Sequence, residues 1–217
     1  RDYYGTTQVV IENEDMMSII KPLNKESTIS VSGTVRETAL FGHCLELKRT
    51  ISIPVFGAEV TVSDELTNLS HADEEYALLY HCNFGYPLVS EEARLALPVG
   101  RKTSPRTPFA STGLDRVTTF DVPKPGEEER VFFHEHMAHE AALINESRNI
   151  RMDLRWSDTL PILAHWRSMA SGDYVCGLEP TNCYIMGRKF ERENGTLPVL
   201  KPFETVKTQV KFHFSEC

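Results

Sequence analysis

Residues 45–53 read Leu45-Glu46-Leu47-Lys48-Arg49-Thr50-Ile51-Ser52-Ile53, and apolar and polar side chains largely alternate along them. Alternation with a period of two is typical of a strand with one face in a core and the other in water. The same pattern recurs on either side, in residues 28–32 and 58–62. These runs predict half-buried antiparallel strands.

Further strand-like runs extend through the rest of the chain, whereas helical stretches are brief. The runs cover residues 7–11, 76–83, 118–122, 131–136, 142–145, 150–156, 174–178 and 206–214. Residues 14–20 predict a turn or two of helix or a continued strand. Residues 161–166 are a second helical candidate, because a first helical turn tolerates Pro. About eleven strands with so little helix predict an all-β fold, a large antiparallel β-sandwich.

The domain organisation is simple. Residues 98–114 are rich in Pro, Thr, Ser, Arg and Gly, and strand-like sequence resumes after them, so they predict a surface excursion rather than a linker. Without an internal repeat, we expect one domain over residues 1–217. The chain opens on Arg1-Asp2-Tyr3-Tyr4 and enters strand-like sequence almost at once, so we expect it to lack part of the natural N-terminus.

Composition narrows the classes of partner. A net charge of −8 disfavours nucleic-acid binding, which depends on clustered Lys and Arg. No run of about eighteen apolar residues occurs, so we expect no membrane helix. The five cysteines match no disulfide framework, which predicts reduced thiols in the cytoplasm. A small-molecule ligand is compatible with this composition. The composition is also compatible with a homodimer.

One candidate proton-transfer group is an imidazole in an apolar strand. If residues 78–84 form an extended strand, His81 and Asn83 point to one face, and Tyr80 and Cys82 point to the other. A lone histidine on a strand is more often a hydrogen-bonded core residue than a catalyst. A polar neighbour on the same face, however, favours a functional role. Imidazole is suited to proton transfer near neutral pH, because its ordinary pKa is about 6.5.

The second candidate is the carboxylate of Glu179, at the end of the apolar run 174–178. Pro180 lacks a backbone donor, so we expect strand pairing to stop at Glu179. Apolar surroundings raise the pKa of a carboxyl group, which makes it a better base. The alternative is an ordinary glutamate in a salt bridge at a strand end.

These two segments resemble the aldose 1-epimerase (galactose mutarotase) superfamily, and an uncharacterised branch of it most of all. The motifs are Tyr80-His81-Cys82-Asn83-Phe84-Gly85-Tyr86-Pro87-Leu88 and Gly177-Leu178-Glu179-Pro180-Thr181-Asn182. Residues 33–37, 160–166 and 202–205 support the resemblance, which spans roughly residues 28–214.

The resemblance implies a β-sandwich with an open sugar cleft and an isomerase that needs no cofactor. It implies that Glu179 takes the proton from the anomeric hydroxyl while His81 protonates the ring oxygen. We expect Asn83 and Asn182 to contact sugar hydroxyls, although either side chain alternatively ties down its own turn. His134 is a further candidate for the cleft. The additional His and Arg that bind sugar in the N-terminal third of mutarotases have no counterpart in this sequence.

Two alternatives remain open at this level. His134-Glu135-His136 with Glu140 four positions later resembles the first metal motif of cupins, and alternation puts the two histidines on one face. That arrangement predicts a metal-dependent sugar isomerase, although the motif's flanking glycines are absent. The other alternative is a carbohydrate-binding module without catalysis. It leaves the presence of both His81 and Glu179 unexplained, because binding alone does not need an acid and a base.

Overall fold

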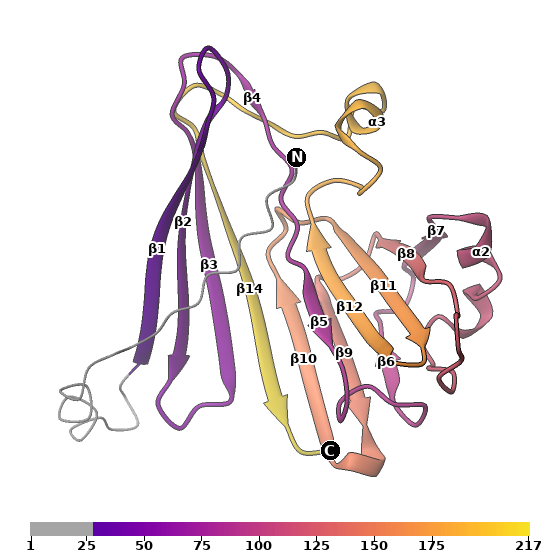
Figure 1. Cartoon of the computed structure of the whole chain (residues 1–217). Helices are drawn as coiled ribbons and strands as arrows, with labels where there is room; N and C mark the ends of the chain where they lie inside the picture. Colours follow the sequence, from indigo (N-terminus) through magenta and orange to yellow (C-terminus); the bar gives the residue numbers. More distant parts are fainter. Residues whose placement is uncertain (1–27) are drawn as a thin grey trace.

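The computed structural model describes residues 28–217, which form two large antiparallel sheets (Figure 1). The predicted strand at 7–11 and helix at 14–20 lie outside the described residues. The first sheet has seven strands, in the order β1 (Thr28–Thr38), β2 (Cys44–Pro54), β3 (Glu59–Asn68), β14 (Thr205–Ser215), β10 (Ile150–Trp156), β9 (Glu140–Asn145) and β6 (Arg94–Ala96). The second has five, in the order β5 (Cys82–Phe84), β12 (Asp173–Thr181), β11 (Ile162–Ala170), β8 (Arg130–Glu135) and β7 (Lys102–Pro105).

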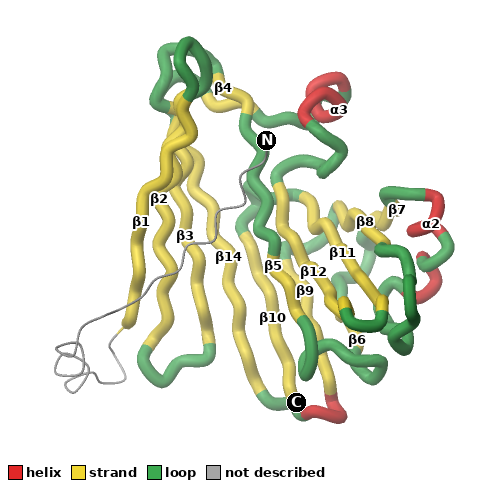
Figure 2. The backbone as a smooth tube through the Cα atoms, in the orientation of Figure 1, coloured by secondary structure: helices red, strands yellow, loops and turns green. Residues whose placement is uncertain are grey.

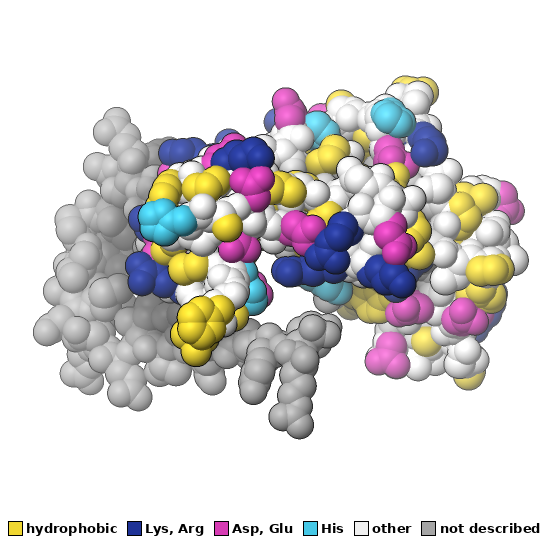
Figure 3. Space-filling model, turned by 90° about the horizontal axis from the view of Figure 1, so that it is seen from above, with side chains coloured by type: hydrophobic (Ala, Val, Ile, Leu, Met, Phe, Trp, Pro, Cys, Tyr) yellow, Lys and Arg dark blue, Asp and Glu magenta, His cyan; other side chains and the backbone are white. Residues whose placement is uncertain are grey.

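The remaining elements are small and lie at the periphery of the sheets (Figure 2). They are the two-stranded sheet of β13 (Val199–Leu200) and β4 (Glu74–Glu75), the helices α2 (Pro108–Ser111) and α3 (Arg188–Glu193), and the 3-10 turns η1 (Leu114–Arg116) and η2 (Glu146–Arg148). Among residues 28–217, no helix has the length and apolarity that a bilayer span requires. Side chains of both charge signs are interspersed over the upper face (Figure 3).

The main core lies between the two large sheets. Met152 and Leu154 alternate with Arg151 and Asp153 along β10, so only the apolar pair faces inward. These two side chains pack in one cluster with Leu178 of β12 and other apolar residues of both sheets. Burial of each such side chain contributes roughly 1.5–3 kcal/mol. The predicted antiparallel β-sandwich is therefore confirmed.

Strand register decides which side chains leave this core and reach the outer face of the five-stranded sheet. Leu178 is buried in the core, so its neighbours Gly177 and Glu179 point the other way. In the pairing of β11 with β12, Trp166 lies opposite Gly177 and Ala164 opposite Glu179. In the pairing of β12 with β5, Asn83 lies opposite Gly177. Three strands thus bring their polar and aromatic side chains to one patch.

Several predicted elements differ from the structure. Residues 161–166 are not a helix but the start of β11, whose apolar side chains are buried on both faces of the sheet. Pairing does not stop at Glu179, because β12 continues to Thr181 and the carbonyl of Pro180 accepts a hydrogen bond from the Tyr80 amide at 3.0 Å. Residues 118–122 form turns and a single bridge rather than a strand. The stretch 98–114 contains β7 and α2.

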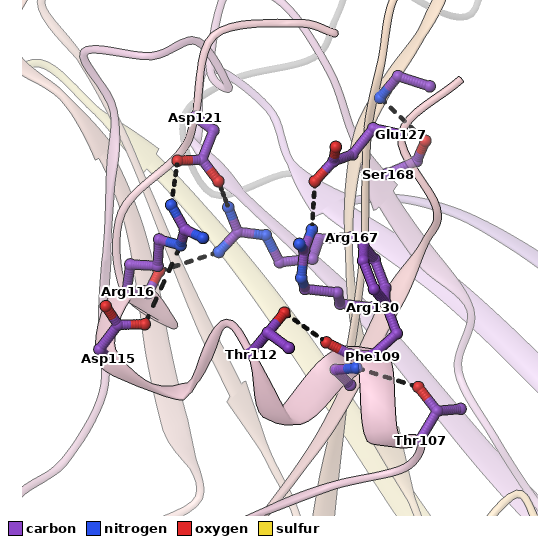
Figure 4. Close-up of polar contacts among 12 residues, drawn as sticks. Thr107, Phe109, Thr112, Asp115, Arg116, Asp121, Glu127, Arg130, Arg167 and Ser168 are labelled. Carbon is purple, nitrogen blue, oxygen red and sulfur yellow. Dashed lines mark hydrogen bonds and ion pairs between the residues drawn. The ribbon is translucent and has the colours of Figure 1, made fainter. Parts of the chain in front are cut away.

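A cluster of arginines fastens the segment around α2 to the sheet (Figure 4). Arg130 lies over the Phe109 ring, 4.1 Å from its centroid, and its Nη1 donates to Glu127 Oε1 at 2.7 Å. The neighbouring Arg167 donates from Nη1 to the Arg116 carbonyl at 3.0 Å. These contacts close one end of the sandwich with cation–π and charged hydrogen bonds.

Candidate active site

The structure brings His81 and Glu179 into direct contact. His81 Nδ1 lies 3.2 Å from Glu179 Oε1, and the two side chains differ sharply in exposure, at 55% for His81 and 2% for Glu179. Glu179 lies on β12, which is paired on both sides, whereas His81 immediately precedes the short edge strand β5. The site therefore combines a fixed carboxylate with an imidazole that is open to solvent.

The electrostatic surroundings make Glu179 a stronger base than an exposed glutamate. Burial raises its pKa, and the nearby negative charge of Glu129 raises it further, while the His81 imidazolium acts in the opposite direction. Within residues 28–217, Glu179 Oε1 has no hydrogen-bond partner despite its burial. A buried oxygen without a donor is unfavourable in isolation, so this atom is suited to accept a hydrogen bond from a hydroxyl group of a ligand.

Gly177 creates the space in which Glu179 lies. A Cβ at this position would lie 2.6 Å from Glu179 Oε1, 3.2 Å from Trp166 Cε3 and 3.3 Å from Asn83 Oδ1. The first distance is far below van der Waals contact. A glycine inside a strand therefore lets three side chains from three strands converge over one backbone position.

Trp166 and Glu129 form the border of this patch. The Trp166 ring packs edge-on toward His81, with centroids 6.0 Å apart and planes inclined by 61°. Its indole Nε1 donates to Glu129 Oε2 at 2.7 Å. Neither residue is singled out as functional by the sequence motifs. The sequence signal that could have found them is Gly177, because an isolated glycine in a strand marks close approach to the backbone.

The two asparagines differ in position. Asn83 is exposed on the outer face, beside Glu179 across Gly177. Asn182 is buried; its Oδ1 accepts from the Leu78 amide at 2.8 Å and its Nδ2 donates to the Tyr76 carbonyl at 3.4 Å. The structure thus leaves Asn83 available to a ligand, whereas Asn182 holds the segment that leads into His81.

The structure does not bring His134 to this site. His134 lies opposite Leu163 on the core-facing side of the sheet and is fully buried, whereas Glu179 faces outward. Its Nδ1 is 2.9 Å from Thr103 Oγ1, and its Nε2 is 3.4 Å from Nδ1 of His165. Burial lowers the pKa of His134 to about 4 and that of His165 well below its ordinary value. Both rings are therefore neutral core residues.

The cupin-like metal site is not formed. His134 is directed into the core, His136 follows the end of β8 with a left-handed φ of 53°, and Glu140 begins β9 in the other sheet. Among residues 28–217, no group of three or more His, Cys, Asp or Glu side chains is placed to hold a metal ion. The alternation that put the two histidines on one face ends at the turn after Glu135.

The fold is a galactose mutarotase-like β-sandwich. A model of the family described as "Domain of unknown function (DUF4432)" matches residues 15–214, so the chain belongs to that family. No curated protein shows significant similarity to the chain.

Solved structures of mutarotase-like proteins share the fold. A candidate aldose 1-epimerase from Klebsiella pneumoniae is 25% identical, with a TM-score of 0.82 over 87% of this chain and 51% of that one. A galactose mutarotase-like protein from Clostridium acetobutylicum is 17% identical, with a TM-score of 0.62 over 88% of this chain and 63% of that one. A galactose mutarotase related enzyme from Lactobacillus acidophilus is 12% identical, with a TM-score of 0.64 over 89% and 69%. The chain spans about half the length of the Klebsiella protein.

The crowding around Gly177 predicts the outcome of a double-mutant cycle. Gly177→Ala should cost roughly 1–3 kcal/mol of unfolding free energy, because the new methyl group displaces the Glu179 carboxylate. In a Glu179→Ala background the same substitution should cost much less. Denaturant unfolding of the four proteins measures the coupling. An equal cost in both backgrounds would contradict a clash with the carboxylate.

The buried histidine pair predicts a loss of stability in mild acid. An unfolded histidine has a pKa of about 6.5, whereas burial lowers the pKa of His134 to about 4. Below about pH 6.5 the unfolded chain therefore binds more protons than the folded one, and the stabilisation present at pH 7 is lost as the pH falls toward 4. For His134 alone, the loss between pH 7 and pH 5 is about 2 kcal/mol of unfolding free energy.

Denaturant unfolding at both pH values checks this expectation. His134→Gln should flatten the pH dependence, whereas His213→Gln, at an exposed position, should leave it unchanged. Burial raises the pKa of Glu179, and this raised pKa increases stability as the pH falls, opposite to the effect of His134. The test therefore compares the slope of unfolding free energy against pH between the proteins rather than its absolute value. An unchanged slope in His134→Gln would exclude this histidine as the source.

Proposed function

We propose that this chain interconverts the α and β anomers of an aldose without a cofactor, with Glu179 as the general base and His81 as the general acid. The observation that carries the proposal is the buried Oε1 of Glu179, which lacks a hydrogen-bond partner among residues 28–217 and lies 3.2 Å from an exposed imidazole. A buried base beside an acid open to solvent is suited to a substrate that must lose one proton and gain another.

The proposed reaction conserves protons over a full cycle. Glu179 accepts the proton of the anomeric hydroxyl, the bond between C1 and the ring oxygen breaks, and His81 donates its proton to that oxygen. The product is the open-chain aldehyde. Rotation about the C1–C2 bond and the reverse transfers then close the ring as the other anomer. Each well-placed acid or base contributes about 10²–10⁴-fold to such a reaction.

His81 and Glu179 lie in direct contact, with 3.2 Å between Nδ1 and Oε1, so a sugar that exchanges protons with both must separate them. Glu179 is buried and fixed, so His81 is the side chain that turns outward to admit the ring. Binding thereby exchanges an ion pair for hydrogen bonds to the substrate.

Removal of the base or the acid should abolish catalysis without unfolding the protein. We expect Glu179→Gln and His81→Asn each to slow anomer exchange by about 10²–10⁴-fold. Exchange NMR of C1 resonances across a panel of aldoses measures the rate. His139→Asn is the matched control, because His139 also pairs with a carboxylate, that of Asp158, 2.8 Å from its Nδ1. A parent protein that binds sugars without accelerating exchange would instead establish a binding module.

The acidic limb of the pH–rate profile should reflect the raised pKa of Glu179. Protonation removes the base, so kcat/KM should fall as the pH decreases through a value above the ordinary carboxyl pKa of 4.5. Glu129→Gln should move this limb toward lower pH, because the Glu129 charge contributes to the raised pKa of Glu179. The measurement is kcat/KM against pH for both proteins. A limb centred at or below 4.5 would contradict the role of Glu179.

A further inference from the structure

The indole of Trp166 lies across the outer face of the five-stranded sheet. Its Cε3 edge leans over β12, where a Cβ at Gly177 would be only 3.2 Å away. Its Nε1, on the opposite long edge of the ring system, donates to Glu129 at the approach to β8. Since β12 and β8 flank β11 on opposite sides, the ring spans the strand that carries it. Contacts on both long edges of the ring, with β12 and with Glu129, leave this side chain little freedom to rotate.

The ring is supported from below and open in part to solvent. It packs against a cluster of outer-face residues that includes Val131 and Ala164. The same side chain is only partly buried, in contrast to its neighbours Ala164 and His165. A rigid aromatic surface with an apolar support and an exposed part is a favourable contact surface for an apolar group of a ligand.

The exposed part of the indole lies next to the acid and the base. The His81 ring centroid is 6.0 Å from that of Trp166, and Glu179 Oε1 and Asn83 Oδ1 converge with the indole over Gly177. A ligand that exchanges protons with His81 and Glu179 therefore contacts the indole as well. Aldopyranoses present C–H groups on their ring faces and hydroxyl groups at their edges, which matches an aromatic surface bordered by polar side chains.

The charges around the ring favour an uncharged sugar. Glu129 is hydrogen-bonded to the indole and Glu179 lies beyond it, so two carboxylates border the surface. Within residues 28–217, the ion pair of Glu179 is with His81, and no Lys or Arg forms an ion pair with either glutamate. A phosphate or carboxylate on the ligand would meet like charges at this border.

We propose that Trp166 is a specificity-determining residue that stacks on the C–H face of a neutral, unphosphorylated aldopyranose, with Glu129 as the positioning residue that holds the indole and disfavours anionic sugars. The inference rests on the proposed function, because it places the sugar by its contacts with His81 and Glu179. It adds the class of sugar and a binding contact that the acid–base pair does not supply.

Binding and kinetics of Trp166 variants test the stacking contact. Titration of the parent with D-galactose and D-glucose should change its intrinsic fluorescence, since the other tryptophan, Trp156, is 7% exposed and lies in the core between the sheets. Trp166→Ala should weaken binding roughly five- to tenfold and raise KM by the same factor with little change in kcat. Trp166→Phe should retain most of the affinity. Unchanged Kd and KM in Trp166→Ala would overturn the proposal.

Phosphorylated sugars test the role of Glu129. The parent should bind galactose 6-phosphate and glucose 6-phosphate more weakly than the free sugars. Glu129→Gln retains an oxygen that accepts the indole N–H but removes the charge, so the ratio of free-sugar affinity to sugar-phosphate affinity should fall. Tighter binding of the phosphates by the parent would overturn the inference.

Sugar binding to Glu179→Gln, measured by saturation-transfer NMR, separates this inference from the proposed function. Retained binding without anomer exchange supports both. Retained exchange in Glu179→Gln, together with weakened binding in Trp166→Ala, would reject the base and keep the stacking surface. No binding of any sugar by the parent would reject both.

Discussion

The absence of a side chain at Gly177 is the constraint on which the outer face of this protein depends. Register places this residue between Trp166 of β11 and Asn83 of β5, one row from Glu179. Neighbouring strands are about 4.8 Å apart, so a row of three full side chains would fill the surface. Because Gly177 carries only a hydrogen atom in place of a side chain, the indole edge of Trp166, the amide of Asn83 and the carboxylate of Glu179 approach the same point. The chemistry of the site is thus a consequence of strand pairing rather than of a flexible loop.

A second buried glutamate in the same protein shows what a structural role looks like. Glu191 is as buried as Glu179, at 2% exposure. Its two carboxylate oxygens accept hydrogen bonds from the Tyr184 and Met186 amides and from the Thr196 hydroxyl, so they stabilise the turn before α3. Among residues 28–217, Oε1 of Glu179 has no comparable donor, and it lies 3.2 Å from Nδ1 of the half-exposed His81 imidazole. Burial alone does not distinguish the two glutamates. The lack of a hydrogen-bond donor at Glu179 Oε1 does distinguish them, because an unsatisfied buried acceptor destabilises a fold unless a ligand supplies the hydrogen bond.

Alternation predicted β10, β14 and β3 of the seven-stranded sheet, where one face is polar. It was wrong about burial at the edge of that sheet, because every residue of β1 is exposed rather than every second one. It also failed where both faces are buried. Along β8, Val131 and Phe133 pack on the outer cluster while Phe132 and His134 face the core, so no period of two separates inside from outside. Alternation therefore placed Glu179 correctly on β12, whereas most of the predicted strand over residues 76–83 is not formed and His81 immediately precedes β5. The side to which His134 points depends on pairing partners that no local pattern specifies. The same absence of a polar face made the start of β11 resemble a helix.

The positions of His81 and Glu179 in the sheet match what the proposed ring opening would demand of an acid and a base. A base that must meet the anomeric hydroxyl in one geometry benefits from a rigid support, and Glu179 lies on β12, held by β11 on one side and by β5 on the other. An acid that must first clear the entrance and then reach the ring oxygen needs freedom, and His81 lies just outside a three-residue edge strand with its side chain in solvent. Because both segments belong to one sheet, their separation is set by register, and under the proposed function rotation of His81 would admit the sugar. The sheet therefore holds the buried Glu179 carboxylate in one position and leaves the exposed His81 imidazole free to rotate.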